Sequence, residues 1–257
     1  MVKVIPDLDK TFDIWMCTCN SEKLLPLTLK RISEVIPSRV INRKFIVDDF
    51  STDNSKEVAE KLGWQVYENK KRGLSNAQRY AFSLVETDYC ASFEHDLYLS
   101  KNWFPRIPNS VIEFGYDAAQ GIRIRDTKGF KELDIYDNNH RNITSADNTF
   151  YVMIPTRNRE ILKGNIDKGV SSYLKWHVDK GVCSRHIRGN VRNSLRHDYC
   201  IYRAVNQERL STHLKSLMKS PLLSLRVIRE TKGISVIVLY PLERLMILCG
   251  ALVSKAF

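Results

Sequence analysis

The sequence of 257 residues lacks the cysteine patterns of zinc-binding and disulfide-rich proteins. Its six cysteines include no C-x-x-C pair and no zinc-finger spacing. Cys17, Cys19 and Cys90 lie in apolar runs, where a free thiol behaves as a small hydrophobic group. This usage favours reduced cysteines and a cytoplasmic protein.

Long apolar runs are also missing. The first ten residues, MVKVIPDLDK, hold no apolar stretch of signal-peptide length. Near the end of the sequence, Pro241, Glu243 and Arg244 interrupt the apolar stretch. They leave uncharged runs of about ten residues, whereas a membrane helix needs about 20. We therefore expect neither export nor a membrane-spanning segment.

Negative charge is scarce in the second part of the chain. Residues 1–150 carry 21 Lys and Arg against 22 Asp and Glu, whereas residues 151–257 carry 19 against 7. A basic surface attracts the phosphates of nucleic acid, anionic lipid or a phosphorylated substrate. Nucleic acid is the weaker alternative, because the basic residues follow no recognisable nucleic-acid-reading module.

Apolar runs of strand length alternate with amphipathic helical patterns through the first hundred residues. Strands are expected at 12–18, 45–47, 65–67 and 89–93, with a helix after each of the first three. This alternation is typical of right-handed βαβ units and a mostly parallel sheet. Ligands of such sheets bind at the carboxyl ends of the strands. The sequence therefore predicts an α/β fold with a ligand cleft at that edge.

The pattern beyond residue 115 is less regular. A strand is expected within 116–124, a flexible polar excursion over 126–147 and a returning strand at 149–155. Helices are expected at 157–163 and at 169–180, where Val170, Leu174 and Val178 share one face, and again from 199 to the end. We therefore predict a nucleotide-binding catalytic domain over 1–198 and a basic, partly apolar helical extension over 199–257.

Acidic side chains follow two of the expected strands. Asp48 and Asp49 end the second strand, and Glu94-His95-Asp96 gives a DxD-like spacing after the fourth. Two adjacent carboxylates need a nucleobase N–H, a ribose hydroxyl or a cation facing them; alternatively one caps the next helix and the other is solvated. In an extended segment, Glu94 and Asp96 would point the same way and hold one hard divalent cation between two phosphate oxygens.

Four motifs, in order, resemble those of family 2 glycosyltransferases of the GT-A fold. They are CTCNSE, VDDFSTDNS, NKKRGLSNA and EHD, and they lie between about residues 12 and 104. The resemblance implies a GT-A-type, Rossmann-like α/β/α sandwich and a nucleoside-diphosphate-sugar donor. It also implies inverting, single-displacement transfer of a sugar to an acceptor hydroxyl, assisted by Mn²⁺ or Mg²⁺. A non-catalytic nucleotide- or glycan-binding protein of the same fold is the alternative.

The resemblance also implies roles for individual residues. The donor would be bound by Cys17, Thr18, Cys19, Asn20, Glu22, Asp48, Asp49, Gly73, Asn76 and Glu94. Asp96 would ligate the metal, with Glu94 and His197 as further ligands and His186 as the alternative to His197. Glu94 stands where the family has Asp, a change that would move it towards the ribose or the sugar. Arg79, in place of the family's Asn, either reaches the diphosphate or lies in a surface ion pair.

The catalytic base of this family is a carboxylate that opens a helix behind the sugar. Asp167 matches this position best and Asp179 is the reserve, while a plain helix N-cap is the alternative role for Asp167. Because the family often acts on lipid-linked acceptors, we expect a lipid-linked or glycan acceptor. The basic extension then either rests on the cytoplasmic face of a membrane or packs on the catalytic domain.

Overall fold

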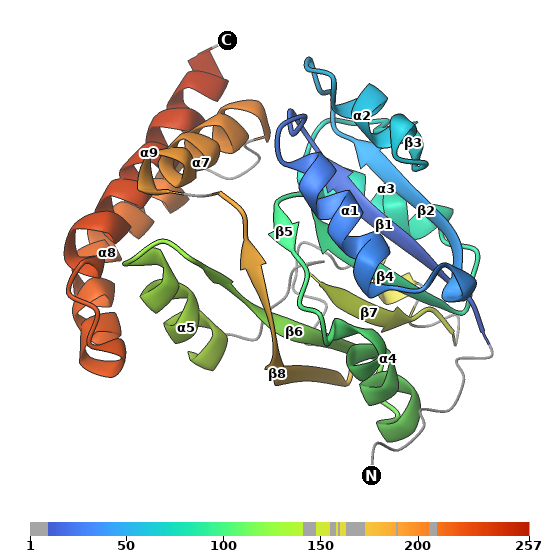
Figure 1. The fold of residues 1–257 in the computed structure, drawn as a ribbon. Coiled ribbons are helices and arrows are strands. Elements are labelled where there is room, and N and C mark those ends of the chain that lie inside the picture. Colours follow the sequence, from blue (N-terminus) through green and yellow to red (C-terminus); the bar gives the residue numbers. More distant parts are fainter. Residues whose placement is uncertain are drawn as a thin grey trace. The chain divides into compact units, whose positions relative to one another are not determined.

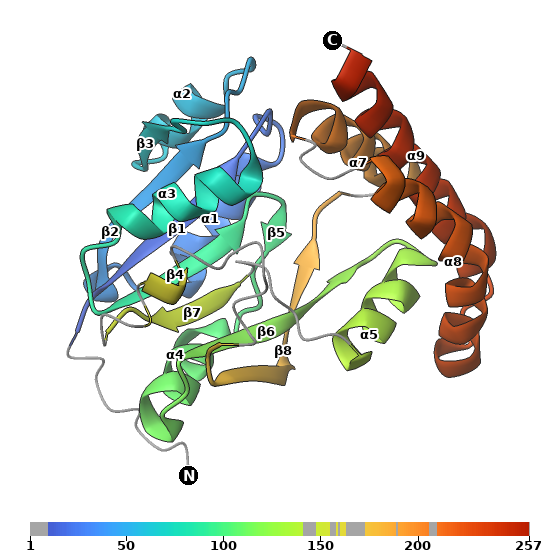
Figure 2. The same ribbon diagram turned by 180° about the vertical axis from the view of Figure 1, so that it is seen from behind.

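A computed structural model describes residues 10–140, 148–154, 158, 160–162, 173–188, 190–205 and 210–256. The chain divides into two compact units, one formed by residues 1–122 and 143–184 and the other by residues 123–142 and 185–257. Figures 1 and 2 show the elements of both units from opposite sides. The predicted division at residue 198 stays a prediction about domains.

The first unit contains the alternating strands and helices that the sequence predicts. Its elements are β1 (Phe12–Thr18), α1 (Leu25–Val35), a 3₁₀ turn (Ser38–Val40), β2 (Ile41–Asp48), α2 (Ser55–Lys61), β3 (Gln65–Glu68), α3 (Leu74–Leu84), β4 (Tyr89–Glu94), β5 (Leu97–Tyr98), α4 (Trp103–Phe114) and β7 (Thr149–Val152). The strands β6 (Ala118–Arg125) and β8 (Trp176–His186) begin in this unit and end in the other. The sheet order is β3-β2-β1-β4-β7-β6-β8-β5.

The sheet is parallel where the predicted motifs lie. β1 pairs in parallel with β2 and β4, and β2 pairs in parallel with β3, whereas β7 runs antiparallel to β4 and β6. In the register, Thr18 of β1 faces Asp48 of β2, and Cys17 of β1 faces Glu94 of β4. The ends of β2 and β4 therefore flank the end of β1. Neighbouring strands lie about 4.8 Å apart, so the backbones of Asp48 and Glu94 are about 10 Å apart.

Both faces of this parallel sheet are buried by helices. Helices α1 and α2 cover one face and α3 covers the other (Figures 1 and 2). Alternate side chains of β1 serve the two faces: Ile14 and Met16 join the core cluster of α1, whereas Trp15 joins the cluster of α3. This arrangement explains why β1 and β2 read as continuous apolar runs rather than as alternating ones.

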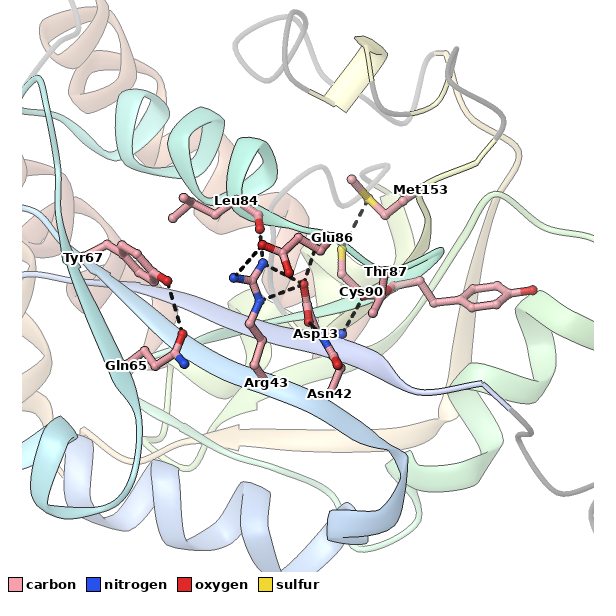
Figure 3. A network of polar contacts seen from close by, with 11 residues as sticks. Asp13, Asn42, Arg43, Gln65, Tyr67, Leu84, Glu86, Thr87, Cys90 and Met153 are labelled. Atoms are coloured by element: carbon pink, nitrogen blue, oxygen red, sulfur yellow. Dashed lines mark hydrogen bonds and ion pairs between the residues drawn. The ribbon is translucent and has the colours of Figure 1, made fainter.

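A buried ion pair fixes the start of β1, at the other end of the strands from Asp48 (Figure 3). The Asp13 side chain is fully buried and accepts hydrogen bonds from Asn42 Nδ2 at 2.8 Å, the Glu86 backbone N–H at 2.9 Å and Arg43 Nη2 at 3.1 Å. Arg43 also pairs with Glu86 at 3.2 Å and donates to the carbonyl of Leu84. Both Asp13 oxygens are thus satisfied, and the cluster ties β1 to β2 and to the connection between α3 and β4.

Two predictions for the middle of the chain were wrong. The expected flexible excursion contains helix α5 (Phe130–His140), on which Phe130 and Leu133 are buried. The expected helix over 169–180 overlaps strand β8, on which alternate residues Val182, Ser184 and His186 are buried. The spacing of Val170, Leu174 and Val178 fits a helix, but the sheet supplies backbone partners that a local pattern does not reveal.

Beyond β8, the second unit contains the helices α7 (Val191–Val205), α8 (Leu210–Thr231) and α9 (Val236–Ala256). The helical character predicted from residue 199 onward is confirmed for the described residues, and the first helix begins earlier, at Val191. Its interior contains charged groups. Arg125 is paired with Asp134 at 3.2 Å and with Glu243. Burial opposes the charge on Arg125, but these carboxylates outweigh burial and raise its pKa well above the usual value. The cluster joins β6 to α5 and α9.

Candidate active site

The loops that follow β1 and β2 are joined by reciprocal hydrogen bonds. The Asn20 backbone N–H donates to Ser51 Oγ at 2.9 Å, and the Thr52 backbone N–H donates to Asn20 Oδ1 at 2.8 Å. Ser21 N–H donates to Ser55 Oγ at 2.7 Å. Asn20 adopts a left-handed conformation with φ 49°, which Asn tolerates better than most residues. These bonds hold the carboxyl ends of β1 and β2 together as one rigid rim.

Glu22 takes part in the same rim. Its backbone N–H donates to Asp53 Oδ2 at 3.1 Å, and its carboxylate accepts from the backbone N–H of Asn54 at 3.1 Å and from Asn54 Nδ2 at 3.0 Å. Asp53 in turn accepts from Ser55 N–H at 3.0 Å. The structure therefore gives Glu22 a role in loop order, and its predicted contact with a nucleotide stays a prediction.

Asp49 organises the loop that precedes α3. It is buried and accepts from Asn69 Nδ2 at 2.7 Å and from the Gly73 backbone N–H at 2.9 Å. Gly73 has φ 120°, a conformation that side chains make costly, so this position requires glycine. Asp49 thus brings the NKKRGLSNA motif to the end of β2. Asn69 was missed in the sequence, although it directly follows a strand as Asp49 does.

Asp48 differs from Asp49 because one of its oxygens is left over. Its Oδ2 accepts from the Ser51 N–H at 2.9 Å, but within the described part of the chain its buried Oδ1 has no hydrogen-bond partner. The buried hydroxyl of Thr18, at the paired position of β1, has none there either. Leaving a buried polar atom unsatisfied costs about 1–3 kcal/mol. A ligand with hydrogen-bonding groups at this point would recover that cost.

An aromatic ring and a guanidinium group lie beside Asp48. Phe50 is 46% exposed with φ 59°, an unusual backbone conformation for an aromatic residue, and the Arg72 guanidinium lies 5.5 Å from its ring centre. Asn76, predicted to bind the donor, donates from Nδ2 to the Arg72 carbonyl at 2.9 Å. Phe50 and Arg72 were missed in the sequence. An exposed aromatic ring can stack on a nucleobase, and a guanidinium group beside it can bind a phosphate.

The cysteines of the first motif are not nucleophiles. Burial, together with the negative charge of Asp49, raises the pKa of Cys17 far above its usual value. Burial, Asp49 and Asp48 raise the pKa of Cys19 to about 12. Both groups are therefore neutral thiols at physiological pH and cannot attack a sugar as thiolates. Cys17 packs as a small apolar group against the core cluster of α3.

The DxD-like motif lies at the same sheet edge, but its geometry differs from the prediction. β4 ends at Glu94, and His95 and Asp96 form a turn before β5. The two carboxylates are therefore not brought to one side by the alternating side-chain directions of an extended strand. The turn at His95 and Asp96 brings them together instead. An oxygen of Glu94 lies within 4.8 Å of an oxygen of Asp96. Thr28 Oγ1 of α1 donates to the His95 carbonyl at 2.8 Å and fixes the turn.

This pair of carboxylates fits a hard divalent cation, because Mg²⁺ and Mn²⁺ prefer oxygen ligands and usually take one or two carboxylates beside phosphate oxygens. Asp96 is 1% exposed, and Glu94 is partly exposed. His197 lies on α7 in the second unit, and His186 ends β8 in that unit. Their roles as metal ligands stay predictions.

The two candidates for the base stand differently. Asp167 lies outside the described residues. Asp179 lies on β8 and accepts from Arg106 Nη2 at 2.8 Å and from the Gly181 backbone N–H at 2.8 Å. Burial opposes its charge, but Arg106 and the Gly181 amide outweigh burial and lower its pKa. A carboxylate held in this way is a weak base, and the role of Asp167 stays a prediction.

Comparison with known sequences gives a match to a family model and matches to curated proteins. The model of Glycosyl transferase family 2 matches residues 13–173, more than half of the chain. The low-salt glycan biosynthesis hexosyltransferase Agl6 of Haloferax volcanii is 29% identical over 118 residues, which are 46% of this chain. The match covers 29% of that protein, well under two thirds of its length.

Comparison with solved structures shows the fold. Glucosyl-3-phosphoglycerate synthase from Mycobacterium tuberculosis, in complex with Mn²⁺, UDP-glucose and phosphoglyceric acid, superposes with a TM-score of 0.52 at 12% identity, covering 69% of this chain and 72% of that one. Its complex with phosphoglyceric acid gives 0.53 at 10% identity, covering 87% and 81%. The predicted GT-A fold class is confirmed. The order of the four motifs, their meeting at one sheet edge and the family match agree, and the chain therefore belongs to glycosyl transferase family 2.

Proposed function

We propose that the protein transfers a hexose from a nucleoside-diphosphate sugar to a hydroxyl of a lipid-linked or glycan acceptor, in the cytoplasm, with inversion at the anomeric carbon. The observation that carries this proposal is a pair of buried atoms, Asp48 Oδ1 and Thr18 Oγ1, that have no hydrogen-bond partner among the described residues. Thr18 lies on the strand next to Glu94 and Asp48 on the strand beyond it, so these atoms are about one and two strand spacings from the strand that ends at Glu94. A nucleoside supplies N–H and hydroxyl donors, and a diphosphate with a cation supplies the charge that faces the carboxylates.

Each group of the site has a chemical task in this proposal. Asp48 accepts a hydrogen bond from the base or the ribose, and Asp49 holds Gly73 and the basic loop in place. Asp96 and Glu94 hold the divalent cation, Mn²⁺ or Mg²⁺. When bound, that cation neutralises the diphosphate. His197, or His186 in its place, would complete the ligand set.

The reaction needs one base and no covalent intermediate. Asp167 accepts the proton of the acceptor hydroxyl as that oxygen attacks the anomeric carbon. The bond from the anomeric carbon to the diphosphate breaks on the opposite side, and its electron pair leaves with the nucleoside diphosphate. The neutral thiols of Cys17 and Cys19 are consistent with this single displacement.

The donor is tested without knowledge of the acceptor. Thermal unfolding is measured with UDP, GDP and dTDP, each with and without Mn²⁺, and a nucleotide that binds shifts the midpoint upward only with the metal. Nucleotide sugars that carry the same nucleobase as the nucleotide that binds are then screened for slow hydrolysis. No shift with any nucleotide contradicts the proposed function. A shift without hydrolysis or transfer favours the alternative of a non-catalytic binding protein.

A further inference from the structure

Helix α8 exposes a row of large apolar side chains. The row comprises Leu214, Met218, Leu222 and Leu225, which are 50%, 72%, 67% and 57% exposed. Their spacing of three and four residues places them on one helix face. The opposite face is buried through His213, Ser220, Ser224 and Val227. Solvent-exposed leucine and methionine at this density on one helix face indicate a partner surface.

The start of α9 extends this apolar surface. α8 and α9 lie side by side, joined by the short connection 232–235 (Figure 1). Ile234 in that connection is 75% exposed, and Ile237 and Val238 are 49% and 65% exposed. The buried row of α9 contains Val236, Tyr240 and Ile247. The connection therefore presents apolar side chains at the end of the hairpin formed by α8 and α9.

Basic side chains flank the apolar row of α8. Lys215, Lys219, Arg226 and Arg229 are exposed and follow one another at spacings of four, seven and three residues, next to Met218 and Leu222. Glu230 is the one acidic residue of α8. An apolar row bordered by lysine and arginine matches a membrane surface of anionic lipids, where the acyl boundary takes the leucines and the headgroups take the cations.

The interior of this unit indicates that the hairpin lies along a membrane surface and does not cross the bilayer. Helix α9 contains, at Val236–Ser254 with mean hydropathy 2.0, a stretch long and apolar enough to cross a bilayer by length and composition. Its buried face, however, carries Glu243, which is 2% exposed and ion-paired with Arg125. Crossing the bilayer would separate this pair and leave a charge in hydrocarbon. An arrangement in the plane of the membrane keeps the pair and still buries the exposed row.

We propose that the α8–α9 hairpin docks this protein on an anionic membrane surface, with Leu214, Met218, Leu222 and Leu225 inserted at the acyl boundary and Lys215, Lys219, Arg226 and Arg229 on the headgroups. The inference rests on the exposed residues of the second unit and is independent of the sugar donor. It places the enzyme where an acceptor with a lipid anchor would be found.

Flotation of the full chain with vesicles tests this surface. Vesicles of phosphatidylcholine with about 30% phosphatidylglycerol, an anionic lipid, are compared with vesicles of pure phosphatidylcholine. Both are tested at about 0.1 and 0.5 M NaCl. Binding is expected only with phosphatidylglycerol and is expected to weaken at the higher salt. Met218→Glu with Leu222→Glu is expected to lower the partition coefficient at least about 100-fold.

Charge is tested separately, with a matched control. Lys215→Gln with Lys219→Gln is expected to lower partitioning about 30-fold at 0.1 M NaCl. Lys61→Gln with Lys101→Gln removes the same charge from exposed positions of the first unit and is expected to leave partitioning unchanged. Unfolding midpoints of all variants are compared, and because the substituted side chains are exposed, each is expected within a few degrees of the parent.

Three results would overturn the inference. The first is the absence of flotation by the parent protein with anionic vesicles. The second is flotation that survives the Met218 and Leu222 substitutions. The third is resistance of the bound protein to alkaline extraction, which would mean that α9 spans the bilayer. Sedimentation showing a dimer that Met218→Glu dissociates, without vesicle binding, would assign the face to a second copy. Nucleotide binding is also measured for the variant that no longer floats with vesicles. If this variant still binds nucleotide, loss of membrane docking is distinguished from failure of the proposed function.

Discussion

Asp48→Asn distinguishes a ligand-binding carboxylate from a structural one. The change keeps the shape of the side chain, and the remaining oxygen can still accept from the Ser51 N–H now bonded at 2.9 Å. What it removes is the charge and one acceptor at Oδ1, the buried atom without a partner in the described residues. Fold stability is therefore expected to change by less than about 1 kcal/mol.

Donor affinity is expected to change much more. A hydrogen bond to a charged group contributes about 1.5–3 kcal/mol, which corresponds to a rise in Kd of about 10- to 150-fold. Isothermal titration calorimetry measures this Kd with the nucleoside diphosphate that stabilises the protein most, in the presence of Mn²⁺. An unchanged Kd would refute the assignment of Asp48 Oδ1 to the donor.

Asp13→Asn is the matched control. It makes the same change on the same pair of strands, at the end where Arg43, Asn42 and the Glu86 N–H already satisfy the carboxylate (Figure 3). Breaking a buried ion pair costs about 3–5 kcal/mol, which lowers the unfolding midpoint by roughly 6–20 °C in a chain of this size. Measured well below that midpoint, its Kd is expected to equal that of the parent. A raised Kd would mean that strand order, and not Oδ1, controls binding.

Three further predictions concern other carboxylates. Asp96→Ala is expected to abolish the Mn²⁺ dependence of nucleotide binding, and calorimetry with unchanged metal-dependent affinity would contradict this. Asp167→Asn is expected to retain donor binding and lose transfer by at least about 100-fold; retained turnover would move the base elsewhere. Burial raises the pKa of Asp198 to about 6, with Arg188 opposing and Glu243 adding to the shift. The folded chain therefore holds a proton that the unfolded chain releases, and the unfolding free energy falls as pH rises from about 4 to about 6. Asp198→Asn removes this dependence, so urea titrations should show the variant gaining up to about 3 kcal/mol relative to the parent between pH 4 and 7; a constant difference would refute it.

The buried charges of the second unit were beyond sequence reasoning. Arg125 and Asp134 stand nine residues apart across a segment that looked like a polar loop, and Glu243 lies 118 residues away. In the sequence, Glu243 reads only as an interruption of an apolar stretch. A charged residue is buried only where oppositely charged residues from other elements pair with it, and a local sequence pattern does not show which distant residues these are.

Local sequence determined the parallel half of the sheet and the edge where the acidic residues gather, because strand length, helical periodicity and the turn chemistry after each strand are all encoded within a few residues. Tertiary structure alone decided which carboxylate is free for a ligand. Asp13, Asp48 and Asp49 are the same residue type in the sequence, and all three are buried in the structure. Arg43 satisfies Asp13, and Asn69 and Gly73 satisfy Asp49. Asp48 keeps one oxygen without a hydrogen-bond partner among the described residues. Hydrogen bonds between residues 20 to 73 positions apart make that distinction, and only the folded chain brings them within bonding distance.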